Sequence, residues 1–132
     1  MCLDYIGRKY TIKRYKKVYK IFMFNTKTGK YKCLYSPFEF HEGQNFAEVH
    51  TITGFRVKYK SGFHCFENLK DAADYVDRYF PRNIWVVIMP VIIPAGTKIQ
   101  YGKESAFFSN YFASVVVTPT LIFHTRNLKE ED

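Results

Sequence analysis

One stretch decides the fold of this chain: SGFHCFENLKDAADYV, residues 61–76. Its first half predicts a short strand, because Phe63 to Phe66 is composed of side chains that suit a partly buried sheet. Asn68 then suits a helix N-cap, since its side chain accepts a hydrogen bond from a free amide of the first turn. Pro81 cannot continue a helix, so the principal helix is predicted over residues 68–80.

The predicted helix carries one apolar stripe, which we expect to face a sheet. Its members fall at helical spacing and are Leu69, Ala72, Ala73, Val76 and Phe80. The small pair Ala72 and Ala73 allows the helix to approach that sheet closely.

Strand patterns lie on both sides of the helix. Residues 17–24 are apolar on both faces after Lys20, which predicts a central strand. A five-residue turn, Asn25 to Gly29, joins this strand to residues 30–35 and predicts a hairpin. With the further strand patterns before and after the helix, the chain predicts an α+β fold with a mainly antiparallel sheet of about seven to nine strands.

The length of 132 residues fits a single domain over residues 1–132. Residues 1–16 are interpreted either as a basic N-terminal arm or as an edge strand. Residues 127–132 are predicted to be a frayed tail.

The positive charge is concentrated at one end of the sequence. Residues 1–32 hold ten basic residues and one acidic residue, whereas residues 33–132 hold ten basic and eleven acidic residues. The net charge of +8 therefore comes from the first third of the chain. Such a one-sided field speeds the encounter with polyanions or phosphorylated ligands. The alternative interpretation is a solvated basic face that keeps a tyrosine-rich protein in solution.

Two groups of basic residues are candidate binding surfaces. The N-terminal group is Arg14, Lys16, Lys17, Lys20, Lys30 and Lys32. The second group is a row on one face of a predicted strand and consists of Arg56, Lys58 and Lys60. Together with aromatic residues such as Tyr35, these cations suit a nucleotide or a single-stranded nucleic acid, because bases stack on rings and phosphates meet cations. An ordinary solvated sheet face is the alternative.

His64 lies between two aromatic residues and has two interpretations. As a structural histidine, its ring nitrogens would bond to backbone groups or to a nearby tyrosine. As a functional histidine, it would be a hydrogen-bond donor or general acid in a ligand cleft, since histidine titrates near neutral pH. The sequence contains no strong catalytic motif, so His64 is the one catalytic candidate and enzyme activity is left open, with binding favoured.

The three cysteines have an odd count and no CxxC spacing, which favours a reducing compartment over a disulfide framework. Cys65 is expected to be a small core residue rather than a nucleophile. No metal site and no cofactor are expected, because the Cys and His residues stand alone. The longest apolar run, Ile84 to Ile93, is half of a membrane span, so we expect a soluble cytoplasmic protein without a membrane partner.

Several motifs together resemble a family of small proteins of tailed phages and giant viruses, some of which are fused to pentapeptide repeats. The matching segments span roughly residues 17–102: Tyr35-Ser36-Pro37-Phe38-Glu39-Phe40, Gly43 with Phe46, Gly62-Phe63-His64-x-Phe66 with the following helix, and Ile93-Pro94-Ala95-Gly96-Thr97. No activity is assigned to that family. The resemblance therefore implies a viral protein acting in the host cytoplasm or carried in the virion.

A fainter similarity exists to ADP-ribosyltransferase domains. It rests on Gly62-Phe63-His64-Cys65-Phe66 and on Ala72-Ala73-x-Tyr75. The Ser-Thr-Ser triplet of those enzymes is absent, and no residue matches their catalytic glutamate. This resemblance implies a degenerate fold that keeps a nucleotide-sized cleft.

Three functions follow as hypotheses. The first is a non-enzymatic viral protein, with a role in evading host defence, that binds an anionic partner: a nucleotide signal, a nucleic acid or an acidic host protein. The binding residues would be Tyr35, Arg56, Lys58, Lys60 and His64. The second is an ADP-ribosyltransferase-like or nucleotide-processing enzyme that uses His64. The third is a structural component of the virion. The oligomeric state is left open.

Overall fold

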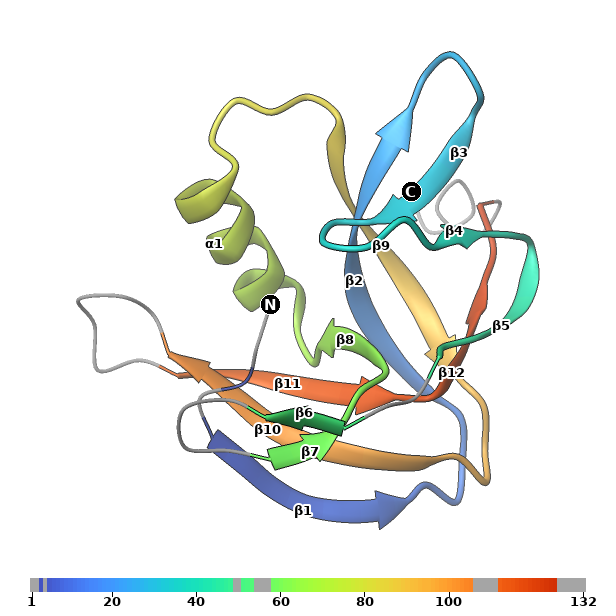
Figure 1. Ribbon diagram of the computed structural model, residues 1–132, viewed down its shortest axis with the longest axis vertical. Coiled ribbons are helices and arrows are strands. Elements are labelled where there is room, and N and C mark those ends of the chain that lie inside the picture. The colour runs from blue at the N-terminus through green and yellow to red at the C-terminus, as the bar shows by residue number, and fades with distance from the viewer. Residues whose placement is uncertain (1–2, 4, 49–50, 54–57, 106–111, 126–132) are drawn as a thin grey trace.

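Antiparallel strands make up most of this protein (Figure 1). The computed structural model describes residues 3, 5–48, 51–53, 58–105 and 112–125. This part contains one helix, α1 (Leu69–Tyr79), and twelve strands. The strands are β1 (Tyr5–Thr11), β2 (Lys16–Asn25), β3 (Lys30–Cys33), β4 (Glu39–Phe40), β5 (Gly43–Phe46), β6 (Thr51–Thr53), β7 (Lys58–Lys60), β8 (Phe63–Phe66), β9 (Val86–Ile93), β10 (Lys98–Ser105), β11 (Phe112–Thr118) and β12 (Thr120–Phe123).

The α+β class and the antiparallel sheet are confirmed, but the prediction of seven to nine strands is wrong. The additional strands are short. Strands β4 and β5, with two and four residues, lie in the segment that follows Pro37. A two-residue strand has no room to show alternation, so only its pairing partner reveals it.

One large sheet has the order β1-β10-β11-β8-β2-β9-β12-β5, and β3 and β4 extend it from β2. Strands β6 and β7 form a separate two-stranded sheet. In Figure 1, β2 and β9 cross the direction of β10 and β11 at a steep angle, so the large sheet is strongly bent. Of the two interpretations of residues 1–16, the structure shows an edge strand over residues 5–11, which pairs with β10 and with no other described strand.

Strand β2 is central, as its two apolar faces predicted. One edge of β2 pairs with β9 from Lys16 to Met23. The other edge is shared by two strands: β3 pairs with it from Phe22 onward, and β8 meets it at Tyr19. Strands β3 and β8 therefore diverge from β2 around Lys20 and Ile21, and they leave a fork in the sheet.

Helix α1 covers residues 69–79, close to the predicted 68–80. The predicted N-cap is present, because the Asn68 side chain accepts a hydrogen bond from the Asp71 amide at 3.0 Å. The predicted buried stripe is wrong in part: Leu69 is exposed, whereas Asp71 and Tyr75 are buried with Ala72. Asp71 tolerates burial because its carboxylate accepts a hydrogen bond from the Ser114 amide.

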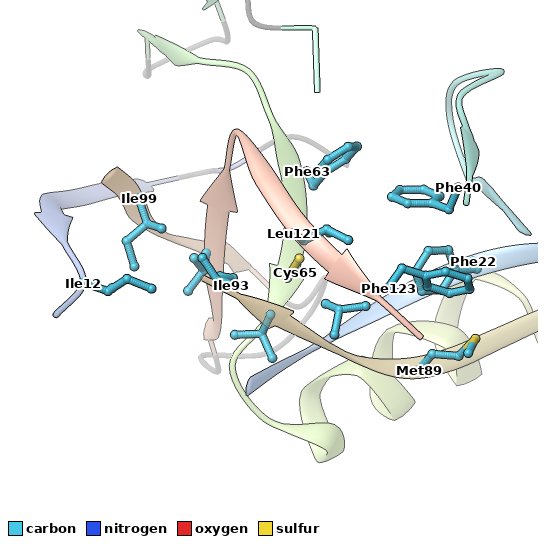
Figure 2. Close-up of a cluster of buried hydrophobic side chains, with 13 residues drawn as sticks. Ile12, Phe22, Phe40, Phe63, Cys65, Met89, Ile93, Ile99, Leu121 and Phe123 are labelled. Carbon is cyan, nitrogen blue, oxygen red and sulfur yellow. The ribbon is translucent and has the colours of Figure 1, made fainter. Parts of the chain in front are cut away.

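Two hydrophobic clusters lie on opposite faces of the large sheet. One includes Phe66, Ala72 and Tyr75 and lies between the sheet and α1. The other lies inside the bend of the sheet, and Figure 2 shows its phenyl rings gathered at one end and Ile12, Ile93 and Ile99 at the other. The aromatic end of this cluster lies beside the fork between β3 and β8.

Within the described residues, no helix is long and apolar enough to cross a membrane.

Candidate functional site

The fork between β3 and β8 opens into a cavity of about 160 Å³, which we call the fork pocket. Its lining comes from β2, from β3 and the turn after it, from β8 and from α1. The lining residues are Lys20, Ile21, Cys33, Leu34, Tyr35, Ser36, Gly62, Phe63, His64, Phe66 and Tyr75. The pocket brings together two of the predicted binding residues, Tyr35 and His64, and adds Lys20 to them.

Lys20 was predicted to belong to an exposed basic surface. This prediction is wrong, because only 6% of its surface is exposed. Strand alternation places it on the same side as Val18 and Phe22, inside the bend of the sheet. Its ammonium group donates a hydrogen bond to the His64 carbonyl oxygen at 3.1 Å. No carboxylate in the described part of the chain forms an ion pair with it.

Three aromatic rings surround the Lys20 ammonium group. The nitrogen lies 5.8 Å from the ring centroids of Phe40 and Phe63 and 6.0 Å from that of Phe22. Contacts at this distance stabilise a cation by about 0.5–2 kcal/mol. Burying an unpaired ammonium costs several kcal/mol, so the rings offset only part of that cost.

His64 makes the hydrogen bonds of the structural interpretation. Its Nδ1 lies 3.2 Å from the Gly62 carbonyl oxygen, which can only accept, so Nδ1 carries the proton. Its Nε2 therefore accepts a hydrogen bond from the Tyr59 hydroxyl at 3.0 Å, and that hydroxyl in turn accepts one from the Leu3 amide. Burial, together with the positive charge of Lys20, lowers the pKa of the imidazole from 6.5 to about 4. His64 is thus neutral near pH 7.

Two tyrosines meet at the fork pocket. The Tyr35 and Tyr75 hydroxyl oxygens are 2.5 Å apart. Burial and the hydrogen bond to Tyr35 raise the pKa of Tyr75 above its ordinary value, so Tyr75 keeps its proton and is the natural donor of the pair. The hydroxyl proton of Tyr35, a half-exposed residue, is then directed to other acceptors.

The two described members of the predicted row of cations, Lys58 and Lys60, do not line the fork pocket. Arg56 lies outside the described residues. Lys58 and Lys60 are exposed on β7. Lys60 instead lines a separate groove of about 350 Å³ together with Lys9 and Lys98, and we call it the lysine groove.

The other predicted surface cations differ in environment. Lys16 forms an ion pair with Glu67 at 3.4 Å, and Lys30 forms one with Glu39 at 3.2 Å. Arg14 and Lys17 are exposed, and Lys32 is partly buried on β3. The N-terminal group is therefore spread over the turn before β2 and both strands of the first hairpin.

Cys65 does not have the features of a nucleophile, and no metal centre is found among the described residues. Cys65 is fully buried, and burial raises the pKa of its thiol to about 11, so it stays protonated. Among the described residues, no group of three or more His, Cys, Asp or Glu side chains is arranged to hold a metal ion.

The buried cation was not recognised from the sequence. The signal was present, because Lys20 stands between Val18 and Phe22 at the two-residue spacing of one strand face. A lysine at such a position also fits an edge or a solvated face, so the pattern alone does not predict burial. Comparison of the chain with models of known protein families, with curated proteins and with solved structures found no match.

Proposed function

We propose that this protein is a non-enzymatic binding protein for an anionic partner, and that Lys20 in the fork pocket holds the anionic group. One observation carries the proposal: an ammonium group buried among three rings lines an open pocket and has no carboxylate partner within the described residues. An ammonium offers three donors, and the His64 carbonyl oxygen uses one of them.

An anion in the pocket would relieve the unfavourable burial of this charge. Two unit charges 4 Å apart attract by about 4 kcal/mol in the partly screened environment of a protein. The Tyr35 and Ser36 hydroxyls at the same pocket can add hydrogen bonds to the anion. The net charge of +8 steers anions toward the molecule, although it does not place them.

Binding is favoured over catalysis by the state of the two candidate reactive groups. The imidazole of His64 is neutral near pH 7, and both of its nitrogens are engaged in hydrogen bonds. The Cys65 thiol is buried and protonated. Neither group is poised to exchange a proton or attack a substrate.

The test is an NMR titration of the protein with acetate, inorganic phosphate and a nucleoside triphosphate. We expect at least one anion to shift the resonances of residues around the fork pocket, and Lys20→Met to weaken that binding about 10- to 100-fold. Lys27→Met removes an equal charge from the exposed hairpin turn and is expected to bind within twofold of the wild type. If no anion binds, or if Lys20→Met binds as well as the wild type, the proposal is wrong.

The lysine groove supports a second candidate function, the binding of a nucleic acid. Lys9, Lys60 and Lys98 surround it, and none forms an ion pair with a carboxylate of a described residue. Three phosphate contacts predict a slope of about −2 for the logarithm of affinity against the logarithm of salt concentration on a single strand. Replacing all three lysines with glutamine should abolish that slope in a gel-shift or fluorescence assay, whereas Lys20→Met should not.

The resemblance to small viral proteins suggests that either candidate function is carried out by a viral protein in a host cell. For a viral protein, the anionic partners that the sequence suggests are a host nucleotide signal, a host nucleic acid or an acidic host protein, and binding one of them would serve to evade host defence.

A further inference from the structure

A second cavity of about 420 Å³, which we call the apolar trough, lies next to the fork pocket. The two share four lining residues: Cys33, Ser36, Gly62 and Phe63. The fork pocket alone is smaller than the roughly 300–1,000 Å³ of a typical ligand site, and the trough brings the space into that range. A ligand whose charged group reaches Lys20 therefore has room for a body in the trough.

The trough is mainly apolar beyond the shared wall. It is lined by Pro37 and Phe38 from the loop before β4, by Ala47 and by Ile52 of β6. The Phe38 ring packs against the Phe63 ring at 5.2 Å between centroids, and the Lys20 ammonium lies 5.8 Å from that same Phe63 ring. Phe63 is thus the point where the charge and the apolar surface meet.

One of the four shared lining residues, Gly62, lies too close to β11 to be replaced by a residue with a side chain. A Cβ atom at Gly62 would lie 2.6 Å from the Thr118 carbonyl oxygen, a distance that real Cβ atoms do not adopt. The absence of a side chain lets the start of β8 lie directly against the end of β11. Pairing with β11 therefore fixes the position of Gly62, which lines both cavities.

The charges allow one negative group on the ligand. Among the described residues that line the fork pocket, Lys20 is the only charged side chain, and His64 beside it is neutral. A phosphate monoester carries about −1.5 to −2 at pH 7 and would keep uncompensated charge in this pocket. Glu48, at the exposed rim of the trough, disfavours a second anionic group at the far end.

We infer that the ligand is a small monocarboxylate with an apolar body, its carboxylate on Lys20 and its hydrocarbon or aromatic part in the trough. This inference rests on the proposed function, because it requires Lys20 to hold an anion. It narrows the class of partner for this pocket from anions in general to amphipathic carboxylates.

The experiment is a titration of the wild-type protein with acetate, butyrate, hexanoate and octanoate, followed by NMR. Burial of each added CH₂ group is expected to raise the affinity about fourfold. Octanamide, which lacks the charge, is expected to bind at least tenfold more weakly than octanoate, and octyl phosphate no more tightly than octanoate. Ala47→Leu, which fills the trough, is expected to weaken octanoate at least tenfold and to leave acetate within twofold.

A second measurement uses Cys33, which lies in the shared wall. In a Cys2→Ser background, octanoate is expected to slow alkylation of Cys33, and acetate at the same concentration is not. This measurement stands even where Ala47→Leu fails to fold.

The outcomes separate the two proposals. If short anions bind at Lys20 but affinity does not rise with chain length, the inference is overturned and the proposed function stands. Equal binding of octanamide and octanoate, or tighter binding of octyl phosphate, also overturns the inference. If no anion binds at Lys20 at all, both proposals fail.

Discussion

Two sets of lysines in this protein have opposite environments. Lys20 is buried among aromatic rings at the fork in β2, whereas Lys9, Lys60 and Lys98 are exposed around the lysine groove. Both sets lie on or beside strands, and none of the four forms an ion pair with a carboxylate of the described residues.

The comparison shows that the effect of an unpaired lysine on stability and binding depends on whether its ammonium group is buried or exposed. In water the groove lysines keep their hydration, so they need no partner and serve mainly to attract anions. Lys20 is buried and makes one hydrogen bond to the protein, so we expect its burial to lower the stability of the empty protein. A side chain kept at such a cost is a functional candidate, whereas exposed lysines are common on any surface.

The largest expected effect comes from Lys20→Met. Methionine has a similar length and no charge, so the substitution removes the cost of burying the ammonium. Replacing buried charges with apolar residues of similar size often stabilises a protein by about 1–4 kcal/mol, and we expect the free energy of unfolding to rise within this range. Urea denaturation at pH 7 measures it, with Lys27→Met as the control. A variant less stable than the wild type would mean that the bond to the His64 carbonyl outweighs desolvation.

The second effect is a pH dependence from His64. Because its pKa in the folded protein, about 4, is lower than 6.5, the unfolded chain binds the proton more readily. The stabilisation is therefore complete above pH 6.5 and is lost as the pH falls from 6.5 to 4, by roughly 2–3 kcal/mol.

The check is the difference in unfolding free energy between the wild type and His64→Gln across this range of pH. Parallel curves for the two proteins would contradict the expectation. Lys20→Met should also raise the pKa of His64 in an NMR titration, whereas substitutions in the lysine groove should leave it unchanged.

A smaller effect is expected at the mouth of the fork pocket. Tyr35→Phe leaves the Tyr75 hydroxyl without its partner at 2.5 Å and is expected to cost about 1 kcal/mol of stability. It should also weaken the binding of a carboxylate at Lys20 severalfold. Thermal unfolding with Tyr15→Phe, at an exposed tyrosine, is the matched comparison. Equal melting temperatures for the two variants would show that the hydroxyl pair contributes no stability.

The smallest effect is expected in the lysine groove. Single changes of Lys9, Lys60 or Lys98 to glutamine should alter the free energy of unfolding by less than about 0.5 kcal/mol, since these side chains are exposed. Urea denaturation of the three variants would show this. If one of these variants changed the free energy of unfolding as much as Lys20→Met does, the proposed difference between buried and exposed lysines would be wrong.

Local signals predicted much of the fold. The N-cap Asn68 and the stop at Pro81 located α1 within one residue at each end. The turn from Asn25 to Gly29 located the first hairpin, because Gly29 adopts a positive φ of 70° and the Asn25 side chain accepts bonds from the turn amides. These features depend on residues close together in the chain.

Features that depend on distant partners were not predicted. Strands β4 and β5 are recognisable only through pairing with β3 and β12. The buried face of α1 was misplaced because Asp71 finds its partner in Ser114, 43 residues away. The bonds of His64 differ from these cases, because its structural interpretation included a backbone group and a nearby tyrosine, and Gly62 and Tyr59 are those partners.

The sequence by itself determined the α+β class, the one helix, the central β2 strand and the excess of positive charge, because each follows from composition or from short-range periodicity. Only the tertiary structure decided that β3 and β8 share one edge of β2, that Lys20 is buried at their fork, and that the pocket there shares part of its lining with the apolar trough. The physical reason is that alternation assigns a side chain to a face of a strand, but the elements that cover that face come from elsewhere in the chain.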